Sequence, residues 1–454
     1  AHAYWRLKGL RADLVIWNES QSGYRQQLQD TILGLIAADP EANVLDRPGG
    51  IFVRAIEHIS QEDRILLQTV ARAILSDANG TLAAQLERLA GRRAQPPLLE
   101  RLLQQADLTD QPSASVLEVA VAQAEAGQLL FDNGLGAFAA DGREYCITLD
   151  EGTTTPAPWC NVMANAQFGT VVSDSSPGYT WAENAHEFRL TPWHNDPVGD
   201  TCGEAFYLRD EETGQVWSPM ALPCRGSGRY TVRHGFGYSV YSHTEHGIAS
   251  ELWVFVDVEQ PIKFSHLRLK NLSGRARRLS VTGYVEWVLG DIRTRSQLHV
   301  VSEVDLATSV LTARNPYNTE FDGRVAFFDA DAPSRSISAD RSEFLGRNGD
   351  MQAPAALSRQ RLSGRVGAGL DPCAAIQIPV TLEAGQSVET VFRLGAASSR
   401  DAALDVARRS RGVATAHAAL LAVRTHWEQV LGTVQVTTPD PAVDLLANGW
   451  LLYQ

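Results

Sequence analysis

From about residue 129 to residue 395, the chain is built of short runs in which β-branched and aromatic residues recur. Gly, Pro, Asn and Asp separate these runs, which is the punctuation expected between strands. Clear examples are residues 204–208, 230–234, 251–256 and 280–287. Many short strands with close turn signals are typical of stacked antiparallel sheets. The sequence therefore predicts a mainly β fold, with a large antiparallel β-sandwich over residues 128–397.

The first 90 residues have a different pattern, in which helical and strand-like stretches alternate. We expect helices within residues 1–10 and 24–38 and from 61 to about 75, and strands at 12–17 and 50–55. Ser60 and Asp63 resemble a capping box at the start of the third helix. This alternation predicts a parallel α/β unit. Two strands are too few to bury both faces of a parallel sheet, so residues 1–90 are interpreted as a truncated α/β segment.

Helical stretches are expected on either side of the sandwich. Residues 91–127 are rich in Ala, Gln, Leu and Arg and are interrupted by Pro96 and Pro97, which favours a linker of short helices. Residues 398–432 return to helical spacing and are interpreted as a second helical linker. Residues 433–437 look strand-like, and Asp440 followed by proline opens a last helix over residues 442–454.

Composition excludes several classes of function. A net charge of −13 argues against a nucleic-acid partner, because phosphates demand a basic surface. No apolar run approaches the roughly 18–20 residues that span a bilayer, so we expect a soluble chain. The five cysteines are scattered, without zinc-site spacing, which favours reduced thiols in a cytoplasmic protein. His234, His243 and His246 are close in sequence without a ligand pattern, so we expect neither a metal nor a cofactor.

One segment carries the strongest functional signal. Residues 178–197 combine aromatic rings, an Arg, carboxylates, Asn and His, and Gly and Pro interrupt them, which predicts a loop. Aromatic faces can cover the apolar face of a pyranose while amides, carboxylates and guanidinium bind its hydroxyls. A sugar-contacting loop and a rigid turn that clamps the edge of the core are both compatible with this composition.

Several motifs in order resemble the glycoside-phosphorylase-like region of cyclic β-1,2-glucan synthases, which is similar to the cellobiose and chitobiose phosphorylases. The motifs that carry the resemblance are residues 4–10, 133–136, 141–145, 155–159, 178–200, 207–210 and 217–219. The resemblance implies an N-terminal supersandwich, a helical linker and an (α/α)6 barrel that supplies the general acid. Residues 433–454 resemble the start of that barrel, so no catalytic residue is assigned within this chain.

The resemblance also implies which residues meet the substrate. Loops of the sandwich in related phosphorylases reach over the mouth of the barrel, in some cases that of a partner subunit. The residues expected to bind sugar are Trp181, Glu187, Arg189, Trp193, Asn195 and Asp196. Arg189 is a candidate for phosphate or sugar hydroxyls, and a structural Arg–carboxylate brace is the alternative.

The resulting hypothesis is the sandwich portion of a cyclic β-1,2-glucan synthase-like enzyme, of the glycosyltransferase or inverting glycoside phosphorylase type. Its partners would be β-glucan or oligosaccharide and inorganic phosphate, with a possible homodimer. The whole protein is expected at the cytoplasmic face of a bacterial inner membrane, and this chain alone is expected to be inactive. The alternatives are a non-catalytic carbohydrate-binding module and a structural domain that docks a barrel or a dimer.

Overall fold

The computed structural model describes residues 2–7, 11–19, 27–37, 44–56, 59–85 and 129–453 of the chain, which forms two compact units, Ala1–Leu89 and Ala90–Gln454. The first unit holds β1 (Leu14–Asn18) and β2 (Ile51–Ala55), which pair in parallel. Its helices are α1 (His2–Leu7), α2 (Gln27–Ala37), α3 (Gln61–Val70) and the short η2 (Asp77–Asn79). The parallel pair confirms the α/β character expected of this segment.

The helix expected from residue 61 to about 75 is shorter than predicted. The Ser60 hydroxyl accepts the Asp63 backbone N–H at 3.1 Å, as the capping box requires. The helix then ends at Val70 because Ala71 takes an extended conformation. The helical linker predicted over residues 91–127 lies outside the described residues.

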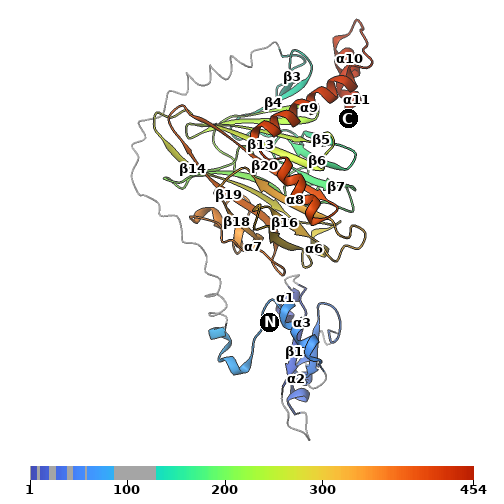
Figure 1. Ribbon diagram of the computed structural model, residues 1–454, viewed down its shortest axis with the longest axis vertical. Coiled ribbons are helices and arrows are strands. Elements are labelled where there is room, and N and C mark those ends of the chain that lie inside the picture. The colour runs from blue at the N-terminus through green and yellow to red at the C-terminus, as the bar shows by residue number, and fades with distance from the viewer. Residues whose placement is uncertain are drawn as a thin grey trace. The chain divides into compact units, whose positions relative to one another are not determined.

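The second unit contains three antiparallel sheets (Figure 1). The ten-stranded sheet has the order β15 (Val301–Val304), β16 (Leu311–Arg314), β17 (Val325–Ala330), β20 (Ser387–Ala397), β13 (Ile262–Asn271), β12 (Ile248–Val256), β11 (Tyr238–Glu245), β10 (Tyr230–Gly235), β4 (Glu144–Leu149) and β3 (Gly136–Phe138). The five-stranded sheet has the order β18 (Ser336–Asp340), β19 (Pro372–Leu382), β14 (Arg277–Glu286), β8 (Glu204–Asp210) and β9 (Val216–Trp217). The three-stranded sheet consists of β5 (Cys160–Ala164), β6 (Phe168–Ser173) and β7 (Tyr179–Ala182). The predicted antiparallel sandwich is confirmed.

The main core lies where the three sheets meet. Val254 of the ten-stranded sheet, Val281 of the five-stranded sheet and Phe168 of the three-stranded sheet belong to one buried cluster. Both smaller sheets therefore pack on one face of the large sheet. Because side chains alternate along a strand, Phe255 points to the opposite face and joins a second cluster.

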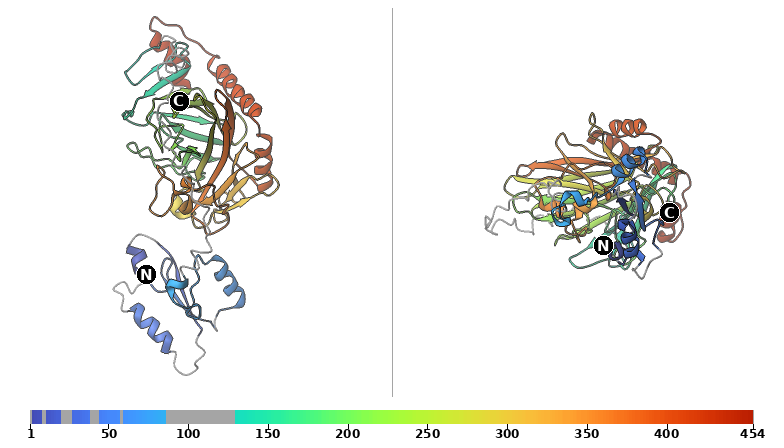
Figure 2. Two further views of the ribbon diagram at one scale, coloured as in Figure 1. Left: turned by 90° about the vertical axis from the view of Figure 1, so that its left-hand side faces the viewer. Right: turned by 90° about the horizontal axis from the view of Figure 1, so that it is seen from below.

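Two helices cover that second face. They are α8 (Arg400–Arg409) and α9 (Val413–Leu431), which flank the sandwich along one side (Figure 2). Ala407 and Ala416 of these helices are buried against a cluster that includes Phe264 and Val391 of the sheet. The helical pattern expected over residues 398–432 is confirmed as two helices rather than one.

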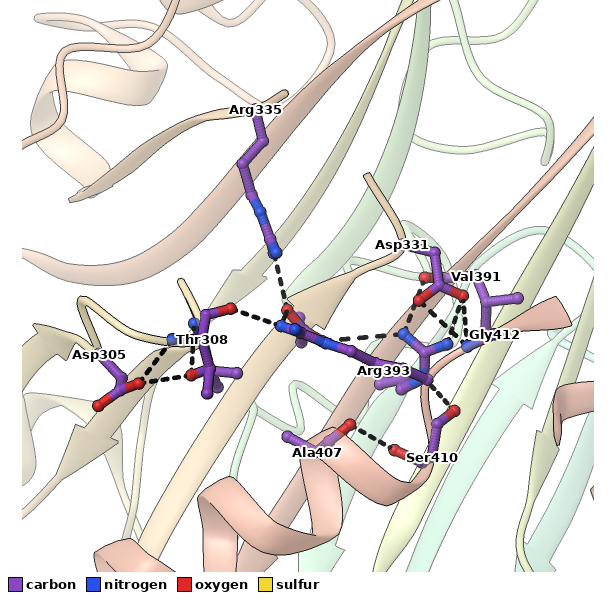
Figure 3. Close-up of polar contacts among 12 residues, drawn as sticks. Asp305, Thr308, Asp331, Arg335, Val391, Arg393, Ala407, Ser410 and Gly412 are labelled. Atoms are coloured by element: carbon purple, nitrogen blue, oxygen red, sulfur yellow. Dashed lines mark hydrogen bonds and ion pairs between the residues drawn. The ribbon is translucent and has the colours of Figure 1, made fainter. Parts of the chain in front are cut away.

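The break between α8 and α9 is held by a buried ionic network (Figure 3). Arg393 of β20 donates from Nε to the Ser410 carbonyl at 2.6 Å, at the end of α8. The Gly412 N–H, where the backbone takes a φ of 98°, donates to Asp331 at 3.1 Å. Arg393 is also paired with Asp331 at 2.5 Å. These contacts fix the direction in which α9 starts.

The remaining helices of the second unit are α6 (Arg293–Ser296), α7 (Arg341–Leu345), η3 (Ala355–Ser358), α10 (Pro441–Leu445), η4 (Leu446–Trp450) and α11 (Leu451–Tyr453). The strand-like stretch at residues 433–437 forms no strand, so that expectation was wrong. The reason is that the Asn448 side chain accepts the Val436 N–H at 2.7 Å and donates to its carbonyl at 2.9 Å, in place of a strand partner. Among the described helices, none is long and apolar enough to cross a membrane.

Candidate functional site

The segment at residues 178–200, here called the lip segment, is anchored in the core of the second unit. Thr180 and Thr191 both donate from their hydroxyls to Glu204 Oε1, at 2.6 and 2.8 Å. Glu204 of β8 is paired at 2.7 Å with Lys263 of β13, and both side chains are almost fully buried. A buried charge needs a partner and hydrogen bonds to offset its desolvation, and this cluster supplies them. The cluster thereby links all three sheets to the lip segment.

The start of the lip segment is a strand rather than a loop. Tyr179–Ala182 forms β7 and pairs with β6, which corrects the expectation of a loop throughout residues 178–197. The physical reason is that the pairing partner, residues 168–171, supplies hydrogen bonds that the composition of the segment does not reveal. Arg189 then returns as an isolated bridge to Trp181 and to Gly290, so the segment folds back on itself.

Three aromatic rings lie in a row on this segment. The Tyr179 ring centroid is 5.2 Å from that of Trp181 and 4.8 Å from that of Trp193. Trp193 is 37% exposed and Trp181 is partly exposed, whereas Tyr179 is buried between them. Burial raises the pKa of the Tyr179 hydroxyl, and Arg189 opposes that shift. The row offers apolar ring surface to a ligand beside a guanidinium group.

Glycine at position 169 makes room for one of these rings. Gly169 of β6 is paired with Trp181 across the strands, and a Cβ there would come within 2.2 Å of the indole ring. The indole therefore lies flat over the backbone of the neighbouring strand. This contact fixes the orientation of Trp181 in the row.

Arg189 is held by backbone carbonyls. Its Nε donates to the Ala185 carbonyl at 3.3 Å and its Nη1 to the Asp291 carbonyl at 3.2 Å. These contacts differ from the Arg–carboxylate brace considered as the alternative, because neither acceptor is charged. Neither of these two contacts neutralises the charge of the guanidinium group.

The Arg189 backbone is also hydrogen-bonded to Gly290, which follows β14. Ion pairs hold the end of β14 in place. Glu286 is paired with Arg293 at 2.5 Å and with Arg341 at 2.6 Å. Arg293 also contacts Asp371. This network stabilises the segment after β14 to which the Arg189 backbone is hydrogen-bonded.

The other predicted site residues have contacts with groups outside the aromatic row. Glu187 is paired with His186 at 2.7 Å. Asn195 takes a positive φ of 49° in an exposed turn. Asp196 Oδ1 accepts the N–H groups of Val198 and Gly199, each at 3.0 Å, and these bonds lower the pKa of the Asp196 carboxyl. Asp196 thus shapes the exposed turn at residues 197–199, which follows Trp193 in the chain.

The four carboxylates of the segment have different partners. Glu183 forms a two-point ion pair with Arg324 at 2.8 and 3.0 Å, and Glu187 and Asp196 are engaged as described above. Asp200 binds the Ser173 hydroxyl, and burial raises the pKa of the Asp200 carboxyl. Each carboxylate serves a separate local structure, which argues against a catalytic pair among them.

Sequence reasoning missed two parts of this site. Tyr179 connects the two Trp rings, and the alternation of Tyr179 and Trp181 along one strand face was the available signal. The Lys263–Glu204 pair joins residues 59 positions apart. No local pattern marks such a pair, because only the sheet packing brings its members together.

The fold and the sequence together define the class of this protein. Residues 143–413 match the glycosyl hydrolase 94 supersandwich domain, and the chain belongs to that family. It is 37% identical over 465 residues to the cyclic beta-(1,2)-glucan synthase NdvB of Rhizobium meliloti (strain 1021), covering 100% of this chain and 16% of that protein. The predicted resemblance to the glycoside-phosphorylase-like region of such synthases is confirmed.

More distant relatives are named as phosphorylases. The N,N'-diacetylchitobiose phosphorylase of Vibrio furnissii is 30% identical over 70% of this chain and 40% of its own length. The 3-O-beta-D-glucopyranosyl-beta-D-glucuronide phosphorylase of Paenibacillus borealis is 28% identical, again over 70% of this chain and 40% of its own length. This chain therefore spans less than half of each of these relatives.

Proposed function

We propose that this chain is the sandwich portion of a cyclic β-1,2-glucan synthase-like enzyme and that its lip segment binds β-glucan. The observation that carries the proposal is the row formed by Trp181, Tyr179 and Trp193. A pyranose ring has an apolar C–H face, and an exposed indole ring can cover that face. Arg189, beside the row, would bind hydroxyls or a phosphate through its remaining donors.

The proposal assigns the bond-making chemistry to a part of the protein other than these 454 residues. The resemblance places the general acid in an (α/α)6 barrel, and inorganic phosphate would act as the nucleophile of an inverting reaction. The carboxylates of the lip segment are engaged in separate contacts, which is consistent with a role in binding alone. By the same resemblance, the whole protein acts at the cytoplasmic face of a membrane and its partner subunit, if any, is a second copy.

Titration with a β-1,2-linked gluco-oligosaccharide tests the binding role. The wild-type chain should show saturable binding by calorimetry together with a change in Trp fluorescence. Trp193→Ala should weaken binding by at least about tenfold, which is ~1.4 kcal/mol, because it removes the most exposed ring of the row.

The matched control is Trp5→Ala. Trp5 is 38% exposed, close to the 37% of Trp193, and it lies in the first unit. It should leave the affinity unchanged. Equal affinities in the two variants, or no binding by the wild-type chain, would contradict the proposed role of the lip segment.

A structural docking role is the second candidate, and one cluster favours it. The C-terminal helices pack on the sandwich through Phe236, Trp450 and Tyr453, whose rings lie within about 6 Å of one another. The Tyr453 hydroxyl donates to Asn161 at 2.7 Å, and Trp450 Nε1 donates to the Gly142 carbonyl at 2.9 Å. A sandwich that only docks the segment after α9 would bind no oligosaccharide in the titration above.

A further inference from the structure

Two histidines and a glutamate converge on the face of the ten-stranded sheet that carries α8 and α9. His266 lies on β13, Glu389 on the neighbouring β20 and His417 on α9. His266 is opposite Val391 in the antiparallel register, so Glu389, two residues from Val391, points to the same face. His417 comes one turn after Val413 and one turn before Leu420, both of which pack against that face.

The three side chains point at a single centre. Nε2 of His266 is 3.0 Å from Glu389 Oε2, and Nε2 of His417 is 3.3 Å from the same oxygen. The two imidazole rings are 4.9 Å apart at an angle of 68°. All three potential ligand atoms lie within 4.8 Å of one another, and this group meets that condition alone among the described residues.

These separations suit a tetrahedral zinc ion. Zinc binds histidine nitrogen and carboxylate oxygen at about 2.0–2.2 Å, which places neighbouring ligand atoms roughly 3.4 Å apart. The two nitrogen–oxygen separations, 3.0 and 3.3 Å, are within 0.4 Å of that length. Two His and one carboxylate are also a donor set known for three-ligand zinc sites, in which water takes the fourth position.

The burial of the cluster is graded in a way that admits an ion. The His266 side chain is 6% exposed, Glu389 29% and His417 54%. The inner ligand is thus held by the sheet, while the outer ligand faces solvent and leaves room for water.

We propose that His266, Glu389 and His417 form a binding site for a divalent transition metal ion of the zinc type. The ion would join two adjacent strands to α9. Since Arg393 and Asp331 already fix the start of α9, the ion would add a second attachment about one turn further along the helix. The proposed sugar contacts of the lip segment play no part in this inference.

Zinc titration of the full 454-residue chain tests the site. Calorimetry should show one Zn²⁺ bound per wild-type chain. His417→Ala and Glu389→Gln should each lower the affinity by at least about tenfold, because even the loss of an outer-shell partner costs 10–100-fold. Circular dichroism should show that both variants fold. We expect His417→Ala to fold because the His417 side chain is largely exposed.

The matched control is His186→Ala. His186 belongs to another His–carboxylate pair, with Glu187 at 2.7 Å, but only two potential ligands meet there. The zinc affinity of the His186→Ala variant should equal that of the wild-type chain. Hydrogen exchange gives a second readout: Zn²⁺ should slow exchange in α9 of the wild-type chain and leave α9 of His417→Ala unchanged.

Several results would overturn the proposal. One is the absence of Zn²⁺ binding by the wild-type chain, and another is Zn²⁺ binding by His417→Ala and Glu389→Gln that is as tight as that of the wild-type chain. A thiolate-to-metal charge-transfer band in the Co²⁺-loaded chain would place the ion at one of the five cysteines instead, because the proposed site contains no sulfur.

Discussion

At the scale of single residues, buried polar groups hold this sandwich together, and one of them makes its stability depend on pH. His234 of β10 is buried, with Nδ1 2.8 Å from the Ser239 hydroxyl and Nε2 3.1 Å from the Trp159 carbonyl. Burial lowers the pKa of His234 from its usual 6.5 to about 4. The folded protein therefore keeps this imidazole neutral at a pH where the unfolded chain protonates it.

The sign of the effect follows from that depressed pKa. The stability that His234 contributes is complete above pH 6.5 and is lost as the pH falls from 6.5 towards 4, by about 3 kcal/mol in total. Urea unfolding of the wild-type chain at pH 7.5 and pH 5 should show about 2 kcal/mol of this loss, because pH 5 still lies above the folded pKa of about 4. His234→Gln should be less stable at pH 7.5 but should show a smaller difference between the two pH values.

His186→Gln is the control, because the His186 side chain is exposed and is paired with Glu187 at the surface. It should keep the pH dependence of the wild-type chain. If His234→Gln also kept it, His234 would not be the group responsible. The Glu245 carboxyl, with a pKa lowered to about 2, loses its contribution to stability only as the pH falls below its usual 4.5, and it stays ionised in the folded protein at both pH values.

At the scale of elements, the pairing of β6 with β7 sets the orientation of Trp181. Gly169→Ala would place a methyl group within 2.2 Å of the indole, so that ring or strand has to move. Overpacking of this kind costs about 1–3 kcal/mol. Chemical denaturation should show that loss, and oligosaccharide binding by the lip segment should weaken with it.

Gly274→Ala is the matched control for this change. Nothing lies within 4 Å of a Cβ at Gly274, and its φ is not in the left-handed region. Its free energy of unfolding should stay within about 0.5 kcal/mol of the wild-type value. A Gly169→Ala variant as stable as Gly274→Ala would show that the Trp181 ring moves aside freely.

At the scale of the whole molecule, the sequence predicted the architecture better than the contacts of the site. Alternating residues such as those of 251–256 identify strands, because the period of two is local. The partners of a strand are not local, so the sequence predicts a loop where the structure has β7. For the same reason, Tyr179, the Lys263–Glu204 pair and the His266–Glu389–His417 cluster had no signal in sequence spacing.

The proposal that the sandwich binds glucan while a barrel carries out the chemistry gives a further prediction. Residues 1–454, mixed with β-1,2-glucan and phosphate, should release no glucose 1-phosphate, whereas a longer form that includes the barrel should release it. The measurement is an enzymatic assay of glucose 1-phosphate. Release by residues 1–454 that disappeared in Asp200→Asn would show instead that the sandwich supplies its own acid.

The buried Lys263–Glu204 pair has a practical consequence for anyone who wishes to alter ligand preference. Because Thr180 and Thr191 hydrogen-bond to Glu204, a transplanted segment without hydroxyl groups at these two positions would leave the buried Glu204 Oε1 without those two hydrogen bonds. Exchanging only the outward-facing rings at 181 and 193 leaves those anchors in place. Redesign should therefore proceed by side-chain replacement on an unchanged backbone.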